Sequence, residues 1–424
     1  MTPEPSLTSS EAYKSKVLAI FVNMLRVLCA ALFLVSGFVK LVDPMGGSYK
    51  VAEYLTHFEV AYSPDLAVML AIALAVTEFS LGAMLLLGVV RRVTLTLLSL
   101  FMLVMTPLTL YLAIVNPIHD CGCFGEAWTL TNWQTFSKNV LLVVIIVLLF
   151  VNWRKIVRFV ATKDQKFIAV WCVTLPLLVS VYCGCYALPL VDFTSYQCGS
   201  RRLLESKGTD AGEFTTTLIY EKEGEQRSFT LDDYPQDDTT WHFVDAIHVP
   251  VVEQMPVEGQ LQLVSSSGIF TVPERGQMLL AVMPYLPLDY PVGASELNVL
   301  YQYADENGIP FYVLTASGVD DIERWNSRVG AEYPYLFADN IELKTMVRSN
   351  PGLMLVDEGV IAYKWSAHQL PDSDELAEML VESEPVERYA ARQCRIALGL
   401  LLLFAFPILC ALQWRTLLSK KKQV

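Results

Sequence analysis

The sequence predicts an α-helical membrane protein with six spans and a soluble α/β domain, on three observations. The 424-residue chain is 53% hydrophobic and only 18% charged, whereas soluble globular proteins carry about 25% charged residues. Six apolar runs each reach the length of about 18 residues that a helix needs to cross a bilayer core. A long hydrophilic block, residues 192–393, separates the fifth run from the sixth and is large enough for a soluble domain.

The charge balance limits the partners. The formal net charge is −13 at pH 7, and the isoelectric point is near 4.9. Binding to nucleic acid needs a basic face, so no nucleic-acid partner is predicted. The high apolar content excludes a disordered chain. The lipid bilayer is therefore the first partner that the composition predicts.

The apolar runs define the predicted spans, and six of them together argue against buried helices of a large soluble enzyme. The runs are residues 17–41, 66–90, 93–115, 136–153, 167–190 and 396–414. They predict the segments 1–16 (N-terminal tail), 17–153 (four-helix membrane domain), 154–166 (basic link), 167–190 (fifth span), 191–275 (β-rich segment), 276–392 (α/β domain), 396–414 (sixth span) and 415–424 (basic tail).

Basic residues predict the orientation of these spans. If the spans alternate, the Lys and Arg residues before the first span, in the two links 91–92 and 154–166 and after the sixth span all face one side. The link 116–135 has no Lys or Arg. Because basic loops stay in the cytoplasm, both termini are predicted to be cytoplasmic. The block 192–393 then faces outward, into the periplasm of a bacterial inner membrane, and no cleavable signal peptide is evident.

The hydrophilic block has a β-rich first part and an α/β second part. Residues 214–273 contain several short strand patterns, whereas strand and helix patterns alternate after residue 276. Such alternation predicts a partly parallel sheet with helices on its faces. In its order of elements, the stretch 276–376 resembles a thioredoxin-like domain, and Pro351 stands where that family keeps a cis-proline.

That resemblance lacks the family's reactive motif. Its Cys-x-x-Cys is expected near residues 285–289, which read Tyr-Leu-Pro-Leu-Asp, and no cysteine occurs in residues 199–393. The domain is therefore predicted to bind or dock a partner rather than to exchange thiols, with a purely structural cap as the alternative.

Four of the nine cysteines form two Cys-Gly-Cys units, and they are the candidate catalytic residues. Cys121 and Cys123 lie in the outer link, and Cys183 and Cys185 lie near the end of the fifth span. A helical rise of about 1.5 Å per residue puts the second unit roughly 25 to 30 Å from Lys166. Both units are thus predicted to face the same oxidising compartment, where disulfides persist. Cys29, Cys172 and Cys410 are assigned to packing within spans.

Three interpretations of the two units stay open. The first interpretation is redox activity. Two thiols one residue apart can close only a tight, strained ring, which Gly permits, and strained disulfides are the labile, oxidising ones. The second interpretation is a structural disulfide that joins Cys121 or Cys123 to Cys183 or Cys185. The third is a metal site with His119, although Cys-x-Cys is not the usual zinc spacing. No metal is assigned.

Two ionisable residues within the predicted spans suggest an intramembrane pair. Counting from the cytoplasmic ends puts Arg26 roughly 15 Å and Glu78 roughly 18 Å deep. The matched depths predict an Arg26–Glu78 pair, which either fixes the helix register or serves proton or quinone chemistry. Lys40 is expected near the outer end of its span, with its ammonium group extended toward the interface.

The first four spans resemble the DoxX/MauE family of small membrane proteins over about 17–153. The similarity is carried by residues 32–44 (LFLVSGFVKLVDP), 77–88 (TEFSLGAMLLLG), 120–125 (DCGCFG), Trp133 and Lys138-Asn139. Members of MauE type are linked to maturation of a disulfide-rich periplasmic enzyme subunit, and members of DoxX type to a thiosulfate:quinone oxidoreductase. The resemblance implies thiol or sulfur redox chemistry at the outer face, with a quinone as a candidate cofactor. The added spans and outer domain leave the substrate open.

Together these observations predict a membrane thiol–disulfide oxidoreductase or maturation factor that acts on a periplasmic protein partner. The alternative is a non-catalytic, membrane-anchored binding or assembly protein, in which the Cys-Gly-Cys units form a structural disulfide.

Overall fold

The structure, a computed structural model, consists of two compact units. The described residues are 9–118, 122–205, 214–222, 225–230, 242–250, 263–265, 268–287, 292–330, 332–381, 391–392, 394–406 and 409. The first unit comprises Met1–Gln197, Lys344–Gly352 and Trp365–Val424, and the second comprises Cys198–Leu343 and Leu353–Lys364. Two segments from the C-terminal half, the short Lys344–Gly352 and the longer Trp365–Val424, therefore belong with the helices of the N-terminal half.

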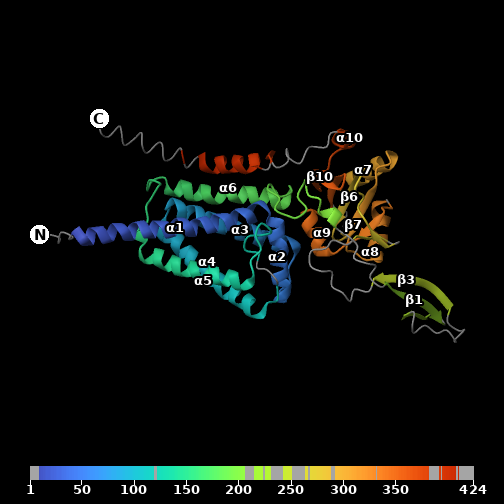
Figure 1. Ribbon diagram of the computed structural model, residues 1–424, viewed down its shortest axis with the longest axis horizontal. Coiled ribbons are helices and arrows are strands. Elements are labelled where there is room, and N and C mark those ends of the chain that lie inside the picture. Colours follow the sequence, from blue (N-terminus) through green and yellow to red (C-terminus); the bar gives the residue numbers. More distant parts are fainter. Residues whose placement is uncertain are drawn as a thin grey trace. The chain divides into compact units, whose positions relative to one another are not determined.

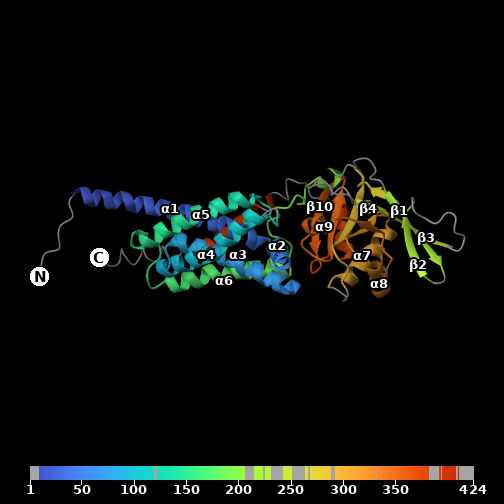
Figure 2. The same cartoon turned by 90° about the horizontal axis from the view of Figure 1, so that it is seen from below.

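The first unit is a bundle of long helices, with the short helix α2 at one end (Figures 1 and 2). Its N-terminal helices are α1 (Ser9–Val42), α2 (Pro44–His57), α3 (Pro64–Leu87), α4 (Arg91–Val115), α5 (Asn132–Val151) and α6 (Gln165–Cys185), followed from the later segments by α10 (Ser373–Val381). A single 3-10 turn, η1 (Trp153–Lys155), follows α5.

Five of the six predicted spans are confirmed as helices that are long and apolar enough to cross a membrane: α1, α3, α4, α5 and α6. The protein is therefore a multi-pass membrane protein. For the sixth predicted span, 396–414, the described part is an apolar helix, Cys394–Phe406, which is shorter than a span. The rest of that run lies largely outside the described residues.

Local sequence signals fix where several helices begin and end. The Ser63 side chain accepts a hydrogen bond from the backbone N–H of Leu66, Pro64 takes the first turn of α3, and Gly88 ends that helix in the left-handed conformation. A capping box between Thr131 and Gln134 starts α5. Helix α2 begins at the N-cap Asp43, directly after α1. It is too short and too polar to register as a span, which is why the apolar runs missed it.

Helix α3 is the central helix of the bundle. In its apolar 18-residue stretch 61% of the residues are buried, against 28 to 33% in the corresponding stretches of α1, α4, α5 and α6. It approaches α1 closely at two glycines. A Cβ on Gly37 would lie 2.7 Å from the Cα of Phe79, and one on Gly82 would lie 2.9 Å from the backbone nitrogen of Leu34. Small residues allow such backbone approach between membrane helices. These two contacts set the antiparallel register of α1 against α3.

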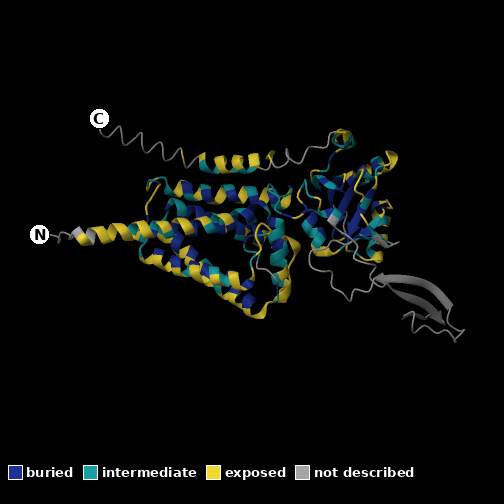
Figure 3. Cartoon of the chain, in the orientation of Figure 1, coloured by how far each residue is buried: buried dark blue, intermediate teal, exposed yellow. Residues whose placement is uncertain are grey.

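The outer faces of the long helices carry large apolar side chains that are exposed, such as Ile20, Leu103 and Val144 (yellow in Figure 3). The interior is closed by a cluster that includes Phe33, Leu98 and Ile146. An apolar exterior around an apolar core suits contact with lipid rather than with water.

The second unit contains a mixed seven-stranded sheet in the order β10-β9-β6-β7-β8-β4-β5. Its strands are β4 (Leu263–Ser265), β5 (Gly268–Phe270), β6 (Gln277–Met283), β7 (Phe311–Thr315), β8 (Tyr335–Phe337), β9 (Gly352–Asp357) and β10 (Val360–Ser366), and its helices are α7 (Ala294–Glu306), α8 (Val319–Val329) and α9 (Asn340–Met346). Strand β6 pairs parallel with β7, and β7 pairs parallel with β8. The predicted α/β domain is thus confirmed.

A second, three-stranded sheet precedes it, in the order β2-β1-β3. It consists of β1 (Phe214–Lys222), β2 (Glu225–Thr230) and β3 (His242–Pro250), and the 3-10 turn η2 (Arg202–Glu205) comes before it. Both pairings are antiparallel. This agrees with the β-rich character predicted for the first part of the hydrophilic block.

Candidate functional site

The loop after α4 carries the first Cys-Gly-Cys unit and packs against the end of α1. His119, Asp120 and Cys121 lie outside the described residues, whereas Cys123 is described and half-buried. The hydroxyl of Ser36 donates to the backbone carbonyl of Cys123 at 2.6 Å. A Cβ on Gly125 would lie 3.0 Å from Cγ1 of Val39, also on α1. The backbone that carries Cys123 is therefore held directly on α1.

Gly122, between the two cysteines, has φ +64°. This left-handed conformation favours glycine, as the Cys-Gly-Cys pattern predicts. A Cβ there would also lie 3.2 Å from Cγ of Lys50 on α2. Gly122 and Cys123 therefore lie beside both α1 and α2.

The second Cys-Gly-Cys unit forms the last turn of α6, and its two thiols have different environments. The Cys183 side chain is buried, with 1% of its area exposed, and a backbone hydrogen bond joins it to Leu190. Cys185 is exposed, and neither residue forms a disulfide with a described residue. Residues two apart on a helix do not share a face. A bond between Cys183 and Cys185 therefore requires the last turn of α6 to open.

The described parts of both Cys-Gly-Cys units lie near the junction where α1 ends and α2 begins. A Cβ on Gly184, between the second pair, would lie 3.1 Å from Cγ of Pro44 and 3.3 Å from Cδ1 of Ile72. Pro44 opens α2 directly after the N-cap Asp43. Because Cys123 is held on the last turns of α1, the described parts of the two units lie at the same end of the bundle.

A buried arginine joins the same region and was not anticipated from the sequence. Arg348 belongs to the segment Lys344–Gly352 of the first unit and has only 5% of its area exposed. Its Nε lies 3.1 Å from Oδ2 of Asp43, and its Nη2 pairs with the carboxylate of Glu126. Its guanidinium carbon lies 5.6 Å from the centre of the Tyr49 ring. One side chain thus bridges the start of α2 and the cysteine loop.

The charges explain why this arginine stays ionised although it is buried. Burial by itself lowers the pKa of Arg348, but the carboxylates of Asp43 and Glu126 more than offset that effect, so the pKa lies above its ordinary value. Nη1 donates to the backbone carbonyl of Lys344 at 2.5 Å. The guanidinium group therefore has partners on all three nitrogens.

The predicted Arg26–Glu78 pair is wrong. Glu78 pairs instead with Lys40, whose Nζ lies 2.7 Å from Oε1 and 2.8 Å from Oε2, and Oγ of Ser36 lies 2.7 Å from Oε2. Lys40 therefore turns into the bundle rather than toward the interface. Arg26 donates to the carbonyl of Val157 at 2.6 Å and lies over the Phe159 ring.

The register of α1 on α3 is the physical reason for this correction. Because Gly37 lies against Phe79 and Gly82 against Leu34, the antiparallel helices bring Glu78 opposite the end of α1. Arg26 lies several turns away, at the link that follows α5. The depth of a residue, counted along its own helix, gives no information on how two helices are set against each other, so the matched depths of Arg26 and Glu78 did not predict a contact.

The remaining sequence-predicted residues have mixed outcomes. The Asn350–Pro351 peptide bond is cis, as the thioredoxin resemblance implied. Cys29 and Cys172 are fully buried, as expected for packing residues, whereas Cys410 lies outside the described residues. The metal interpretation depends on His119 and Cys121, which also lie outside them.

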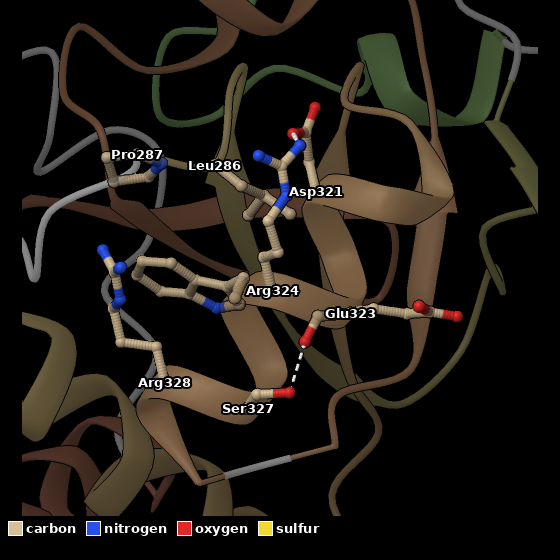
Figure 4. Close-up of a pocket in the computed structure, with 8 residues that line it drawn as sticks. Leu286, Pro287, Asp321, Glu323, Arg324, Ser327 and Arg328 are labelled. Atoms are coloured by element: carbon tan, nitrogen blue, oxygen red, sulfur yellow. Dashed lines mark hydrogen bonds and ion pairs between the residues drawn. The ribbon is translucent and has the colours of Figure 1, made fainter.

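The second unit offers one described pocket of about 490 Å³ along α8 (Figure 4). It is lined by Leu286, Pro287, Asp321, Glu323, Arg324, Trp325, Ser327 and Arg328. Arg324 pairs with Asp321 at 2.6 Å, and Ser327 donates to the carbonyl of Glu323. None of these eight lining residues is a cysteine.

Comparisons with known proteins cover only part of this arrangement. Residues 214–253 match a domain of unknown function (DUF8463). No curated protein matches the chain. Residues 18–152 match the family described as methylamine utilisation protein MauE. This match contains Lys40, Glu78 and Cys123 but neither α6 nor Arg348. Residues 18–152 therefore form a MauE family domain, with apolar helices, inside a longer membrane protein.

Proposed function

We propose that this protein is a bacterial inner-membrane thiol–disulfide oxidoreductase, or a factor that matures a periplasmic partner by thiol exchange. The observation that carries the proposal is that the described parts of the two units, Gly122-Cys123 and Cys183–Cys185, lie at the α1–α2 junction. The Cys123 backbone is held by Ser36 on α1, and Gly184 lies against Pro44 on α2. Exchange between the two pairs requires that their thiols lie at the same end of the bundle, and the described thiols meet this condition.

The exchange consists of two displacements at sulfur. The Cys123 thiolate attacks the Cys185 sulfur of a Cys183–Cys185 disulfide, and the Cys183 sulfur leaves and takes up a proton. The Cys121 thiolate then attacks the Cys123 sulfur, closes the loop disulfide and releases Cys185 as a thiol. Two electrons thus pass from the loop pair to the helix pair. A quinone is the proposed acceptor that takes them from the helix pair, with two protons, and becomes a quinol.

The difference in exposure between the two helix thiols supports this order of events. Cys185 is exposed and is open to attack, whereas the buried Cys183 is reached only through Cys185. The loop pair would in turn accept electrons from a dithiol of the partner, which leaves as a disulfide.

The proposed compartment rests on the basic residues. Arg91, Arg92 and the link 154–166 lie at the end of the bundle that carries no Cys-Gly-Cys unit. The positive-inside rule makes that end cytoplasmic. The opposite end, with the cysteines, then faces the periplasm, where disulfides persist.

The Cys-free domain is proposed to be a thioredoxin-like docking module. The strand order β10-β9-β6-β7, the helix between the parallel strands β6 and β7 and the cis bond at Pro351 support this assignment. Without a cysteine in residues 199–393, the module binds a partner and leaves the chemistry to the membrane half.

The second candidate is a non-catalytic assembly protein in which a disulfide between the loop and α6 is structural. The burial of Cys183 favours it, because buried sulfurs exchange slowly.

Thiol trapping of the full-length protein in native membranes decides between these two functions. The sample is exposed to glutathione buffers of defined potential, quenched in acid and labelled with maleimide, and the cysteine-containing peptides are weighed. We expect both pairs to change state with the potential, as they should in Cys29→Ala, whereas the Cys123→Ser variant loses the transition of the loop pair. Pairs that keep one state at every potential would instead support the assembly protein.

A further inference from the structure

We infer that Arg348 is a positioning residue that holds the cysteine loop beside the end of α6, so that exchange between the two pairs depends on its charge. This inference rests on the proposed function and deepens it. It assigns a role to a residue outside the MauE family domain, which ends at residue 152.

The bridge made by Arg348 has two anchors on the membrane helices. Its Nε binds Oδ2 of Asp43 at 3.1 Å, and Asp43 caps α2 by accepting from the backbone N–H of Gly46 at 2.9 Å. The next residue, Pro44, lies against Gly184 between the helix cysteines. One carboxylate thus ties the guanidinium group to the second Cys-Gly-Cys unit.

The other anchor is on the loop itself. Nη2 of Arg348 binds the carboxylate of Glu126, three residues beyond Cys123. Ser36 donates a hydrogen bond to the Cys123 carbonyl. The loop is therefore fixed at two points. Ser36 lies within the MauE family domain, whereas Arg348 lies outside it.

The space around the guanidinium group leaves little freedom. A Cβ on Gly46 would lie 2.9 Å from Nη2 of Arg348 and 2.5 Å from Oδ2 of Asp43. The Tyr49 ring lies beside the guanidinium carbon at 5.6 Å, within the range of a cation–π contact. The planar guanidinium group of an arginine can donate to both carboxylates at once and so fits this site. A lysine would supply the positive charge but not this fixed set of N–H donors.

The geometry predicts the effect of removing the charge. Without Arg348, the carboxylates of Asp43 and Glu126 face each other without a cation, and the loop is released from its second anchor. Reacting groups that are misplaced by about 1 Å react roughly 100-fold more slowly. Exchange between the pairs should slow by that order, while the reaction of Cys185 with a small reagent keeps its rate.

The test uses the full-length protein with Arg348→Met, Arg348→Lys and the reciprocal variant Arg348→Glu with Glu126→Arg. Arg324→Met is the matched control, because Arg324 also pairs with a carboxylate but is exposed in the second unit. The rate of electron transfer between the pairs is followed by acid quenching and peptide mass. The labelling rate of Cys185 by maleimide is measured in parallel.

We expect Arg348→Met to slow transfer by about 100-fold, Arg348→Lys and the reciprocal variant to restore part of the rate, and Arg324→Met to have no effect. Transfer at the wild-type rate in Arg348→Met would overturn the inference. So would slow transfer that is matched by an equal change in Cys185 labelling and restored by neither rescue variant, since that pattern indicates general unfolding.

A second measurement separates this inference from the proposed function. If the wild-type pairs never exchange, the proposed function fails, and positioning is judged by a short bis-maleimide cross-link between Cys123 and Cys185 in a Cys121→Ser, Cys183→Ser background. Loss of that cross-link in Arg348→Met supports the positioning role by itself. An unchanged yield contradicts it.

Discussion

Nζ of Lys40 lies 2.7 Å from Oε1 of Glu78 inside the helix bundle, with 10% and 6% of the two side chains exposed. Ser36 joins this pair to the loop, because its hydroxyl lies within hydrogen-bond distance of both Oε2 of Glu78 and the Cys123 carbonyl. One side chain, Ser36, thus connects an ion pair within the membrane domain to the backbone of a candidate redox cysteine.

Breaking this pair from one side is expected to destabilise the bundle. Lys40→Met or Glu78→Gln leaves one buried group without its partner, and such a loss costs about 3–5 kcal/mol. The double variant Lys40→Met with Glu78→Leu should be more stable than Lys40→Met alone. Thermal unfolding of the detergent-solubilised protein measures these differences. Arg26→Leu combined with Glu78→Leu serves as control, and its two effects should add; strong coupling there would restore the Arg26–Glu78 pairing.

The close approach of α1 and α3 predicts a large effect from one added methyl group. Gly37→Ala places a Cβ against the Phe79 backbone, which cannot move aside as a flexible side chain would. Overpacking of this kind costs about 1–3 kcal/mol. Gly399→Ala is the control, since a Cβ there meets nothing within 4 Å. Equal unfolding temperatures for the two variants would contradict this packing.

The two helix cysteines should differ in reactivity. The exposed Cys185 should react with a polar maleimide at the rate of an ordinary thiol, and the buried Cys183 only after α6 opens or the protein unfolds. Peptide masses during a labelling time course give both rates in one sample. Labelling of Cys183 as fast as Cys185 under native conditions would mean that the last turn of α6 is not formed.

Removing the Ser36 hydroxyl should loosen the cysteine loop. Ser36→Ala deletes the donor to the Cys123 carbonyl, and a hydrogen bond of this kind contributes about 1 kcal/mol. We expect faster amide hydrogen exchange in residues 122–126 by mass spectrometry, with little change in the long helices. Ser137→Ala is the control, because that hydroxyl donates only to its own helix, at the Trp133 carbonyl. Unchanged exchange in the loop would show that other contacts hold it.

Much of the fold followed from the sequence, because apolar length and strand–helix alternation are local signals. Five spans and the mixed sheet were predicted in this way, whereas the cis bond at Pro351 was implied by the resemblance to thioredoxin-like domains. The ion pair was not, because the partner of Glu78 depends on how Gly37 and Gly82 set one helix against another. Arg348 was missed for a similar reason: it contacts Asp43 across about three hundred residues of chain, and no local pattern marks an arginine that folding will bury.

The return of residues 344–352 to the membrane half has a practical consequence for dissecting this protein. A truncated chain that stops after Gln197 keeps every long helix from α1 to α6 and all four cysteines of the two units, but it lacks Arg348. The carboxylates of Asp43, at the start of α2, and Glu126, in the cysteine loop, would then repel each other. Deleting everything after Gln197 therefore does not leave the helices of the first unit in their native state, and adding residues 344–352 back as a separate peptide tests whether Arg348 restores it.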